Sequence, residues 1–315
     1  MHERAPPVSI VSAMIGEGAS DGGCKFGPAA LKAMGFYGCI AEAGRTGNFG
    51  ATVVADATSA RDRLDVVERF SDELATVTCG LVDQQQMPLI LGGDHSCAVG
   101  SWSGIAQALR KQGDLGLIWI DAHLDAHTPE SSDSKAPHGM PLAALLGYGT
   151  AGLTSIYGWS GKLQPGNVVV IGARSYEPAE KDLLCRLGVR VMYMPEVQRR
   201  GFSSCFEEAR ALATRSTVAW GISFDLDGLD PQDAPGTGTP VESGIRLEEA
   251  LAAFGSFNDS RLCAFELAEY NPLKDFGGQT AKAAFRLSAA ALSAGKPSLM
   301  ATGVALDVCT AHEPA

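Results

Sequence analysis

Two patterns of apolar residues follow one another along this chain. Short runs rich in Val, Ile and Leu are typical of buried strands, whereas apolar residues spaced three or four positions apart are typical of amphipathic helices. The longest helical pattern covers residues 58–86 and places Leu64, Phe70 and Leu74 on one side. Because segments of the two kinds alternate, the sequence predicts an α/β fold with parallel strands.

The predicted strands are apolar runs that end in small or polar residues, and they cover 8–15, 87–91, 115–120, 167–172, 189–193, 218–224 and 261–267. The predicted helices, besides 58–86, cover 96–111, 140–147, 181–187, 202–213 and 281–294. No internal repeat or low-complexity linker interrupts this order. We therefore expect a single α/β/α domain over residues 1–315.

A glycine-rich stretch, 16–23, follows the first predicted strand. Such a loop can bind phosphate, but this one lacks the Gly-x-Gly-x-x-Gly spacing and the Lys-Ser/Thr ending of the known phosphate loops. We expect a flexible surface loop instead. A helix is predicted to open at Gly27-Pro28, because proline is tolerated in the first turn.

Side chains that can bind metal follow three of the predicted strands. They are His95, Asp121, His123, Asp125, Asp225 and Asp227. The period-2 spacing at the end of a strand directs alternate side chains the same way, and parallel strands place their carboxyl ends, where ligands bind, at one edge of the sheet. Glycines 92 and 93 allow a sharp turn just before His95. The sequence therefore predicts that the six side chains converge.

Four carboxylates and two imidazoles exceed what one ion needs, and they fit two divalent ions of the manganese, iron or zinc class with shared carboxylates. Metal binding would also neutralise a cluster of like charges. The alternative is structural: Asp and His end strands and cap helices, and a lone histidine is more often a hydrogen-bonded core residue. Three strand ends with the same character favour the metal site.

Composition excludes several classes of function. A net charge of −11 at pH 7 disfavours nucleic-acid binding and suits a cationic ligand. No apolar run is long enough to cross a membrane, and the N-terminus lacks a secretory signal, so we expect a cytoplasmic protein. The eight cysteines are scattered, which indicates reduced thiols rather than disulfides or a zinc site. We assign no role to His312 and Glu313.

Three motifs carry a resemblance to a known family. Gly92–Ser96, Asp121–Asp125 and Ser223–Pro231 resemble the three metal-binding signatures of the arginase/agmatinase ureohydrolases, and the resemblance extends approximately from Gly16 to Leu292. It implies a three-layer α/β/α sandwich with a mainly parallel eight-stranded sheet. It also implies two Mn²⁺ ions per subunit, although Co, Ni, Fe or Zn accept the same ligands, and a homotrimer or homohexamer.

The resemblance also implies a role for each metal ligand. His95 and Asp125 would bind one ion, and His123 and Asp227 the other. Asp121 and Asp225 would bridge the two ions. A metal-bridging hydroxide would then attack the carbon of a guanidino group and release urea.

Four further residues match functional positions of the family, in addition to Asp125, which would pass a proton to the departing amine. Glu269 matches the glutamate that binds the guanidinium group, since a carboxylate orients a planar cation. His138 matches a histidine that shuttles protons, a role that suits an imidazole near neutral pH. Thr239 matches a threonine beside the guanidinium. Ser134 matches a serine near the α-carboxylate of the substrate.

The segment 128–141 ends in His138-Gly139-Met140-Pro141, which resembles the arginase motif His-Gly-Gln-Pro. This favours hydrolysis of L-arginine to L-ornithine and urea. His127 stands where arginases have an asparagine that contacts the α-carboxylate, and Glu177 where an aspartate contacts the α-amino group. His127 can still donate and Glu177 can still accept, although the extra methylene of Glu177 shifts its oxygens.

Three alternatives stay open. A related hydrolase could act on agmatine, guanidinobutyrate or a formimino compound with the same metal centre. A zinc-dependent deacetylase of related fold would lack part of the second metal group, which is complete here. A regulatory relative would bind guanidino ligands without turnover.

Overall fold

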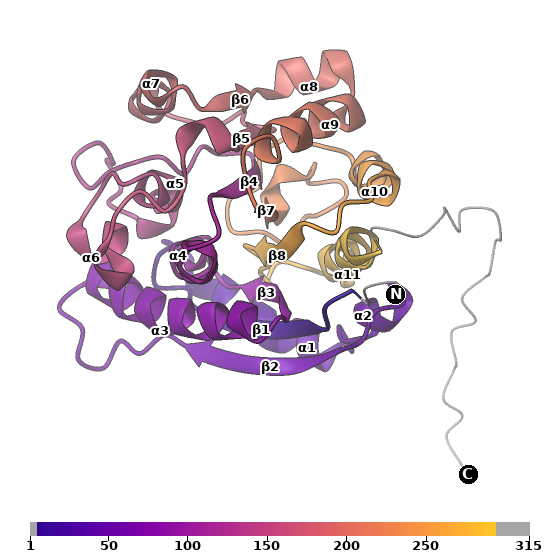
Figure 1. Cartoon of the computed structure of the whole chain (residues 1–315), viewed down its shortest axis with the longest axis horizontal. Coiled ribbons are helices and arrows are strands. Elements are labelled where there is room, and N and C mark those ends of the chain that lie inside the picture. Colours follow the sequence, from indigo (N-terminus) through magenta and orange to yellow (C-terminus); the bar gives the residue numbers. More distant parts are fainter. Residues whose placement is uncertain (1–4, 294–315) are drawn as a thin grey trace, which may run out of the picture.

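The computed structural model describes residues 5–293, and its centre is a sheet of eight parallel strands (Figure 1). The strands are β1 (Val8–Met14), β2 (Gly47–Val54), β3 (Met87–Gly92), β4 (Leu115–Ile120), β5 (Val168–Ile171), β6 (Arg190–Met192), β7 (Ala219–Asp225) and β8 (Leu262–Ala268). Their order across the sheet is β2-β1-β3-β8-β7-β4-β5-β6. This order places β3, β8, β7 and β4 in the middle, so the predicted ligands follow three of the four central strands, β3, β7 and β4.

Helices cover both faces of the sheet. The longer ones on one face are α3 (Arg63–Asp83), α4 (Cys97–Leu109) and α7 (Pro178–Leu187), and those on the other are α9 (Phe202–Ala213), α10 (Leu247–Ser256) and α11 (Gln279–Leu292). Figure 1 shows the first set on the left and the second on the right. The shorter helices are α1 (Gly27–Ala33), α2 (Gly38–Glu42), α5 (Pro141–Leu145), α6 (Ala151–Thr154) and α8 (Met194–Arg200). The predicted three-layer α/β/α sandwich is confirmed.

Alternation of side chains along β4 explains how one sheet supports two cores. Leu117 and Trp119 pack into the apolar cluster under α3 and α4, whereas Ile118 and Ile120 pack into the cluster under α9 to α11. All four are fully buried. A strand covered on both faces must be apolar at every position, which is why the sequence shows unbroken apolar runs rather than alternation.

Helix α4, which begins two residues after His95, packs closely on α3 through glycines. A Cβ on Gly104 would lie 2.2 Å from the carbonyl oxygen of Ala75, and one on Gly100 would lie 2.7 Å from that of Ser71. Thr78 also donates a 3.1 Å hydrogen bond to the Ser101 carbonyl. This contact fixes the start of α4 and therefore the backbone of His95.

Two features differ from the sequence-based expectations. The edge strand β2 was not predicted, because most of its side chains are at least partly exposed and it has no continuous apolar run. The loop after β1 is not a flexible surface loop at its start: Gly16 and Gly18 are buried, and the Gly18 N–H donates a 2.8 Å hydrogen bond to Asp94 Oδ2. A Cβ on Gly18 would lie 2.5 Å from Asp94 Oδ1, so the glycine is there for close packing.

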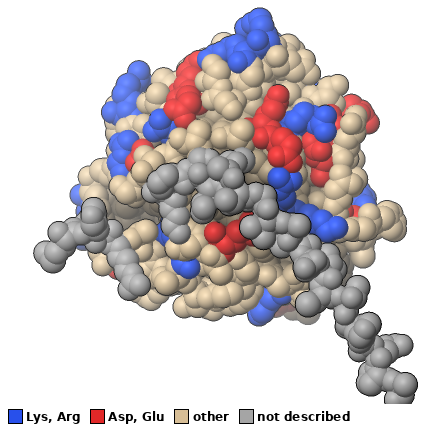
Figure 2. All heavy atoms as spheres, turned by 90° about the vertical axis from the view of Figure 1, so that its right-hand side faces the viewer, with Lys and Arg blue, Asp and Glu red and all other residues tan. Residues whose placement is uncertain are grey.

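The surface carries mixed charges. Figure 2 shows acidic and basic side chains interspersed on the face that includes α8 and α9. Arg190, Glu196, Arg200 and Glu208 form an alternating network of ion pairs there. Within residues 5–293, no helix combines the length and apolar character needed to cross a membrane. His312 and Glu313 lie outside the described residues.

Candidate metal centre and substrate cleft

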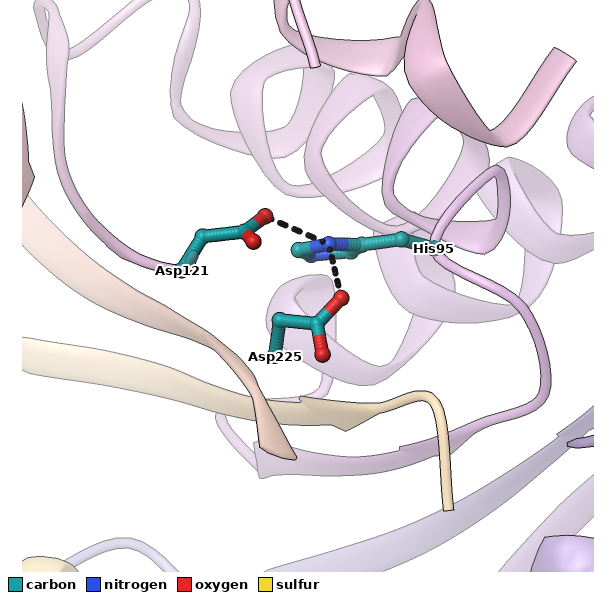
Figure 3. Close-up of side chains that lie close together, drawn as sticks. All are labelled: His95, Asp121 and Asp225. Atoms are coloured by element: carbon teal, nitrogen blue, oxygen red, sulfur yellow. Dashed lines mark ion pairs between the residues drawn. The ribbon is translucent and has the colours of Figure 1, made fainter. Parts of the chain in front are cut away.

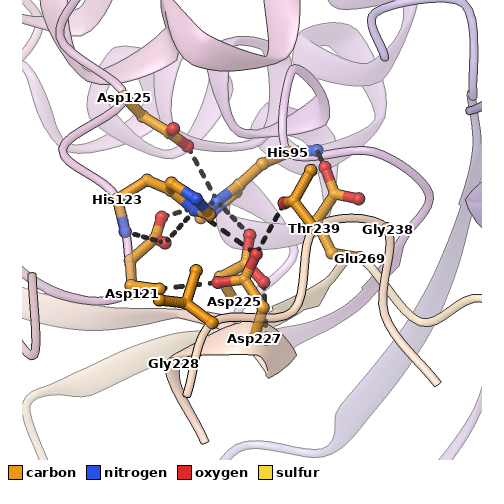
Figure 4. A network of polar contacts seen from close by, with 12 residues as sticks. His95, Asp121, His123, Asp125, Asp225, Asp227, Gly228, Gly238, Thr239 and Glu269 are labelled. Atoms are coloured by element: carbon orange, nitrogen blue, oxygen red, sulfur yellow. Dashed lines mark hydrogen bonds and ion pairs between the residues drawn. The ribbon is translucent and has the colours of Figure 1, made fainter. Parts of the chain in front are cut away.

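The six predicted ligands come together at the carboxyl edge of the sheet (Figure 4). Asp225 is the last residue of β7, and Asp227 lies in the 3-10 turn Leu226–Gly228 that follows. His95 follows β3 after a tight turn at Gly93, where a Cβ would lie only 1.8 Å from the carbonyl oxygen of Ile15. Only glycine therefore allows the chain to bring His95 over the end of the sheet.

His95 forms the first group (Figure 3). Its Nδ1 lies 3.3 Å from Asp121 Oδ2 and 3.1 Å from Asp225 Oδ2, and both carboxylates are drawn there. Nδ1 is also 3.1 Å from Asp125 Oδ2, which Figure 4 includes. The side chain is buried, yet Nδ1 makes no hydrogen bond within the described part of the chain. A buried nitrogen directed at three carboxylates without a hydrogen bond is what a metal ion would satisfy.

His123 forms the second group. Its Nδ1 lies 3.4 Å from Asp121 Oδ1 and 3.3 Å from Asp227 Oδ2. The ligand atoms of His95, Asp121 and Asp225 lie close enough together to hold one ion, and so do those of Asp121, His123 and Asp227. Asp121 belongs to both sets. The two oxygens of Asp121 face different histidines, as expected of a carboxylate shared by two ions.

A buried relay sets the orientation of His95. Its Nε2 lies 2.9 Å from Ser223 Oγ, and the Ser223 hydroxyl donates a 2.8 Å hydrogen bond to Glu266 Oε1. Trp102 Nε1 donates to the same oxygen at 3.1 Å. Because the single proton of Ser223 goes to Glu266, the hydroxyl accepts from Nε2–H, and the lone pair of His95 is left on Nδ1, which faces the carboxylates.

The like charges of the centre oppose one another. Burial and the neighbouring Asp121 raise the pKa of Asp125 to about 6. Burial, Asp227 and Asp121 raise the pKa of Asp225 well above its usual value. Divalent cations would relieve this repulsion. The donor set, the shared carboxylate and the orphaned Nδ1 therefore all fit two hard or borderline divalent ions.

A cleft of about 300 Å³ reaches this centre. The predicted site residues that line it are His123, Asp125, His127, Ser134, His138, Glu177, Asp225, Thr239 and Glu269. Thr239 donates a 3.0 Å hydrogen bond to Asp227 Oδ2. The structure therefore gathers the predicted catalytic, substrate-binding and metal-binding residues around one cavity and its floor.

Glu269 lies at the inner end of the cleft. Its Oε1 accepts a 3.0 Å hydrogen bond from the backbone N–H of His95 and lies 3.0 Å from His138 Nδ1. The backbone of Glu269 is left-handed, with φ of 65°, and its N–H is held by the Gly93 carbonyl at 2.8 Å. Burial alone raises the pKa of Glu269, but the hydrogen bonds and the charge of His138 outweigh burial and lower it.

His138 is affected in the opposite direction. Burial lowers the pKa of an imidazole, but the hydrogen bond with Glu269 and the nearby carboxylates raise the pKa of His138 to about 9. The two side chains are therefore a charged pair at neutral pH, with the imidazolium at the wall of the cleft.

His127 and Glu177 lie together at the outer part of the cleft. His127 Nε2 is 2.8 Å from Glu177 Oε2, and its Nδ1 is 3.0 Å from Ser131 Oγ. Glu180, which the sequence analysis did not single out, accepts a 3.1 Å hydrogen bond from the N–H of Ala126 and caps α7 together with Glu177. The sequence signal that could have revealed it is the capping-box spacing of Glu177 and Glu180.

A parallel α/β sheet whose carboxyl edge carries two adjoining metal-binding groups, at the floor of a cleft lined by acid and base side chains, defines a metal-dependent hydrolase. Comparison with known proteins gives the family. The family model described as the arginase family matches residues 7–293. The chain belongs to the arginase family.

Individual relatives agree with this assignment. The chain is 38% identical over 287 residues to an arginase of Brevibacillus brevis, covering 89% of this chain and 95% of that one. It is 37% identical over 290 residues to an arginase of Bacillus caldovelox, with 89% and 96% covered. The crystal structure of arginase from Bacillus subtilis superposes with a TM-score of 0.85 at 34% identity, over 93% of this chain and 100% of that one. The resemblance inferred from the three motifs is confirmed.

Proposed function

We propose that this arginase-family hydrolase converts L-arginine to L-ornithine and urea. The observation that carries the proposal is the arrangement of the cleft: Glu269 lies beside the two metal-binding groups at one end, and the His127–Glu177 pair lies at the other. A guanidinium cation fits the first end and the zwitterionic head of an α-amino acid fits the second.

The proposed cofactor is a pair of Mn²⁺ ions, although the donor set also suits Co, Ni, Fe or Zn. His95 and Asp125 would hold one ion and His123 and Asp227 the other, with Asp121 and Asp225 shared between them. When bound, the two ions supply water acidified enough to act as the nucleophile at neutral pH.

Glu269 orients the substrate. Its lowered pKa keeps the carboxylate ionised, and two carboxylate oxygens match two N–H groups of a planar guanidinium. Thr239, next to the metal-binding groups, offers its hydroxyl oxygen on the same side of the cleft. These contacts direct the guanidinium carbon toward the centre.

Asp125 and His138 handle protons. Asp125 accepts the proton that leaves the attacking water and passes it toward the departing amine. His138 is protonated at neutral pH because its pKa is about 9, and it exchanges protons between the cleft and solvent from a side chain that is about 22% exposed. Release of the amine as a neutral leaving group requires this proton supply.

His127 and Glu177 bind the α-amino acid head group of the substrate. The α-ammonium of the substrate would bind Glu177, and the α-carboxylate would accept from His127 and Ser134. The pair offers a zwitterion one donor and one acceptor, since the imidazole of His127 can donate and the Glu177 carboxylate, whose pKa is lowered by hydrogen bonds with Glu180 and His127, can accept.

Agmatine is the second candidate substrate. Asp133 and Glu177 both line the outer cleft, and neither lysine nor arginine lines it among the described residues. This acidic mouth favours a cationic head group that carries no carboxylate. A deacetylase and a non-catalytic relative are less well supported, because both metal-binding groups have all their side chains.

The test is urea release by the manganese-loaded protein with L-arginine, agmatine, 4-guanidinobutyrate and free guanidine. We expect the highest kcat/KM with L-arginine. Preference for agmatine would retain the metal chemistry and overturn the substrate assignment, and no urea from any of the four would overturn the proposed function.

We also propose a cytoplasmic homotrimer or homohexamer with one active site in each subunit. Light scattering of the purified protein measures the assembly, and a monomer in solution would contradict it.

A further inference from the structure

The candidate guanidinium-binding glutamate has a third, unexpected partner. Cys24 lies in the 3-10 turn Gly22–Phe26, 245 residues from Glu269 in sequence, and its Sγ is 3.1 Å from Glu269 Oε2. Both side chains are buried. From the sequence alone, Cys24 is one of eight scattered cysteines expected to be reduced thiols, with no functional role.

The turn that carries Cys24 is held on both sides. Asp21 Oδ1 accepts a 3.0 Å hydrogen bond from the N–H of Gly23, and Lys274 forms an ion pair with Asp21 at 2.7 Å. A Cβ on Gly23 would lie 2.5 Å from the side-chain amide of Asn271, two residues after Glu269. The turn is therefore packed directly against the segment that presents Glu269, and Cys24 has little freedom to move away.

The thiol can act on Glu269 only as a donor. Burial and the neighbouring carboxylates of Glu269, Asp94 and Asp225 raise the pKa of Cys24 far above the usual range of a thiol, so the sulfur keeps its proton. A protonated thiol is a weak hydrogen-bond donor and carries no charge. It can orient a carboxylate without neutralising it.

The two oxygens of Glu269 are held differently. Oε1 has two nitrogen partners, the backbone N–H of His95 and Nδ1 of His138. Within residues 5–293, the hydrogen-bond donor to Oε2 is the thiol of Cys24. Gly238, visible beside Glu269 in Figure 4, lies next to both atoms: a Cβ there would lie 2.8 Å from Oε2 and 3.6 Å from Cys24 Sγ. Thus the thiol of Cys24 and the space left by the absence of a side chain at Gly238 together determine the position of Oε2.

We propose that Cys24 is a positioning residue for substrate binding, which fixes Oε2 of Glu269 so that both carboxylate oxygens meet the guanidinium in one plane. This inference rests on the proposed function, because it takes Glu269 as the guanidinium ligand. A bidentate contact requires both oxygens to be placed, and the torsion of the carboxylate about its last bond is otherwise broad.

The test compares Cys24→Ala, which removes the donor, with Cys24→Ser, which keeps a donor of similar size. Cys39 provides the matched control: like Cys24 it is fully buried and does not line the cleft, but it lies in α2 rather than against Glu269. For Cys24→Ala we expect KM for L-arginine to rise about three- to tenfold, as for loss of one hydrogen bond, with kcat changed by less than about twofold. Cys24→Ser restores KM, and Cys39→Ala and Cys39→Ser behave like the wild type.

Thermal unfolding and bound manganese are measured on each variant, because a folding defect would lower the melting temperature and the fraction of active protein rather than raise KM. Equal impairment of Cys24→Ser and Cys24→Ala would mean that the sulfur only fills space, and wild-type KM in Cys24→Ala would mean that it positions nothing. Either result overturns the inference.

A second readout separates this inference from the proposed function. The manganese-loaded wild type and both Cys24 variants are titrated calorimetrically with guanidinium chloride, which reports on binding at Glu269 independently of L-arginine hydrolysis. Weaker binding to Cys24→Ala and wild-type binding to Cys24→Ser support the positioning role even if no substrate is hydrolysed. Equal binding to all three contradicts it, whatever the activity.

Discussion

The indole ring of Trp119 stacks on the imidazole of His95, with ring centroids 4.2 Å apart and planes inclined by 15°. The indole nitrogen also donates a 2.9 Å hydrogen bond to Asp121 Oδ2. One core residue of β4 therefore fixes the ring plane of one candidate ligand and an oxygen of another. The centre is preorganised by the same packing that holds the sheet together, so little order remains to be imposed when ions bind.

Changes to the relay behind His95 should weaken metal binding. For Ser223→Ala we expect the affinity for manganese to fall about 10- to 100-fold, because Nε2 loses the acceptor that directs Nδ1 at the carboxylates. Activity is measured against free manganese, together with ions bound per chain. Saturating manganese should restore most of kcat. The control is Ser103→Ala, a buried serine whose hydroxyl makes no hydrogen bond within residues 5–293; an unchanged manganese affinity in Ser223→Ala would contradict the relay.

Loss of the shared carboxylate should be more severe. Asp121 belongs to both metal-binding groups, so Asp121→Asn is expected to remove at least one ion per chain and to lower kcat by at least about a thousandfold. Atomic absorption and urea release provide the two measurements. Asp72→Asn, an exposed substitution on α3, serves as the control. Full turnover by a chain that no longer binds manganese would refute the proposed mechanism.

The convergence of the ligands could be predicted from the sequence, although part of the reasoning was wrong. The expectation was that residues 121–125 continue the period of the strand. In fact β4 ends at Ile120, and Asp125 has a left-handed backbone with φ of 49°. The side chains meet because the chain turns over the end of the sheet. What the sequence revealed correctly was that three apolar runs end in ligand-type residues. Parallel strands in the middle of one sheet bring these ends to the same edge.

The groups behind the ligands could not be predicted in the same way. Ser223 and Glu266 are each a polar residue within a buried apolar strand. Such a residue indicates that a buried polar partner exists, but the sequence does not show which residue that partner is. Cys24 is one of several scattered cysteines, and its contact with Glu269 joins opposite ends of the chain. The edge strand β2 has no continuous apolar run, and most of its side chains are at least partly exposed. Contacts of this kind depend on tertiary packing, which single-sequence patterns do not encode.

The pKa of His138 leads to a prediction about stability and pH. A histidine whose pKa is raised in the folded state, here from 6.5 to about 9, stabilises the fold fully below about pH 6.5 and loses this contribution as the pH rises through about 9. For metal-depleted protein we expect His138→Asn to melt below the wild type at pH 6.5, with the difference shrinking toward pH 10. Thermal unfolding at a series of pH values measures it. A difference that stays constant with pH would mean that His138 acts through packing rather than through its charge.

The His127–Glu177 pair leads to a prediction about substrate preference. Agmatine keeps an ammonium but lacks the α-carboxylate, whereas 4-guanidinobutyrate has a carboxylate and no amino group. For His127→Ala we expect kcat/KM for L-arginine to fall about tenfold or more, the effect of one charged hydrogen bond, with a smaller change for agmatine. For Glu177→Gln we expect L-arginine and agmatine both to lose efficiency, and 4-guanidinobutyrate to be affected least.

Asp182→Asn is the control for this pair, because it removes an exposed carboxylate from α7, the helix that Glu177 caps, and Asp182 does not line the cleft. It should leave the ratio of L-arginine to 4-guanidinobutyrate close to that of the wild type. If His127→Ala instead lowers the efficiency with all substrates equally, His127 supports the loop beside Asp125 rather than reading the carboxylate. The His127–Glu177 pair would then have a structural role in the cleft. Specificity for the α-amino acid head group would have to come from Ser134 and the backbone around it.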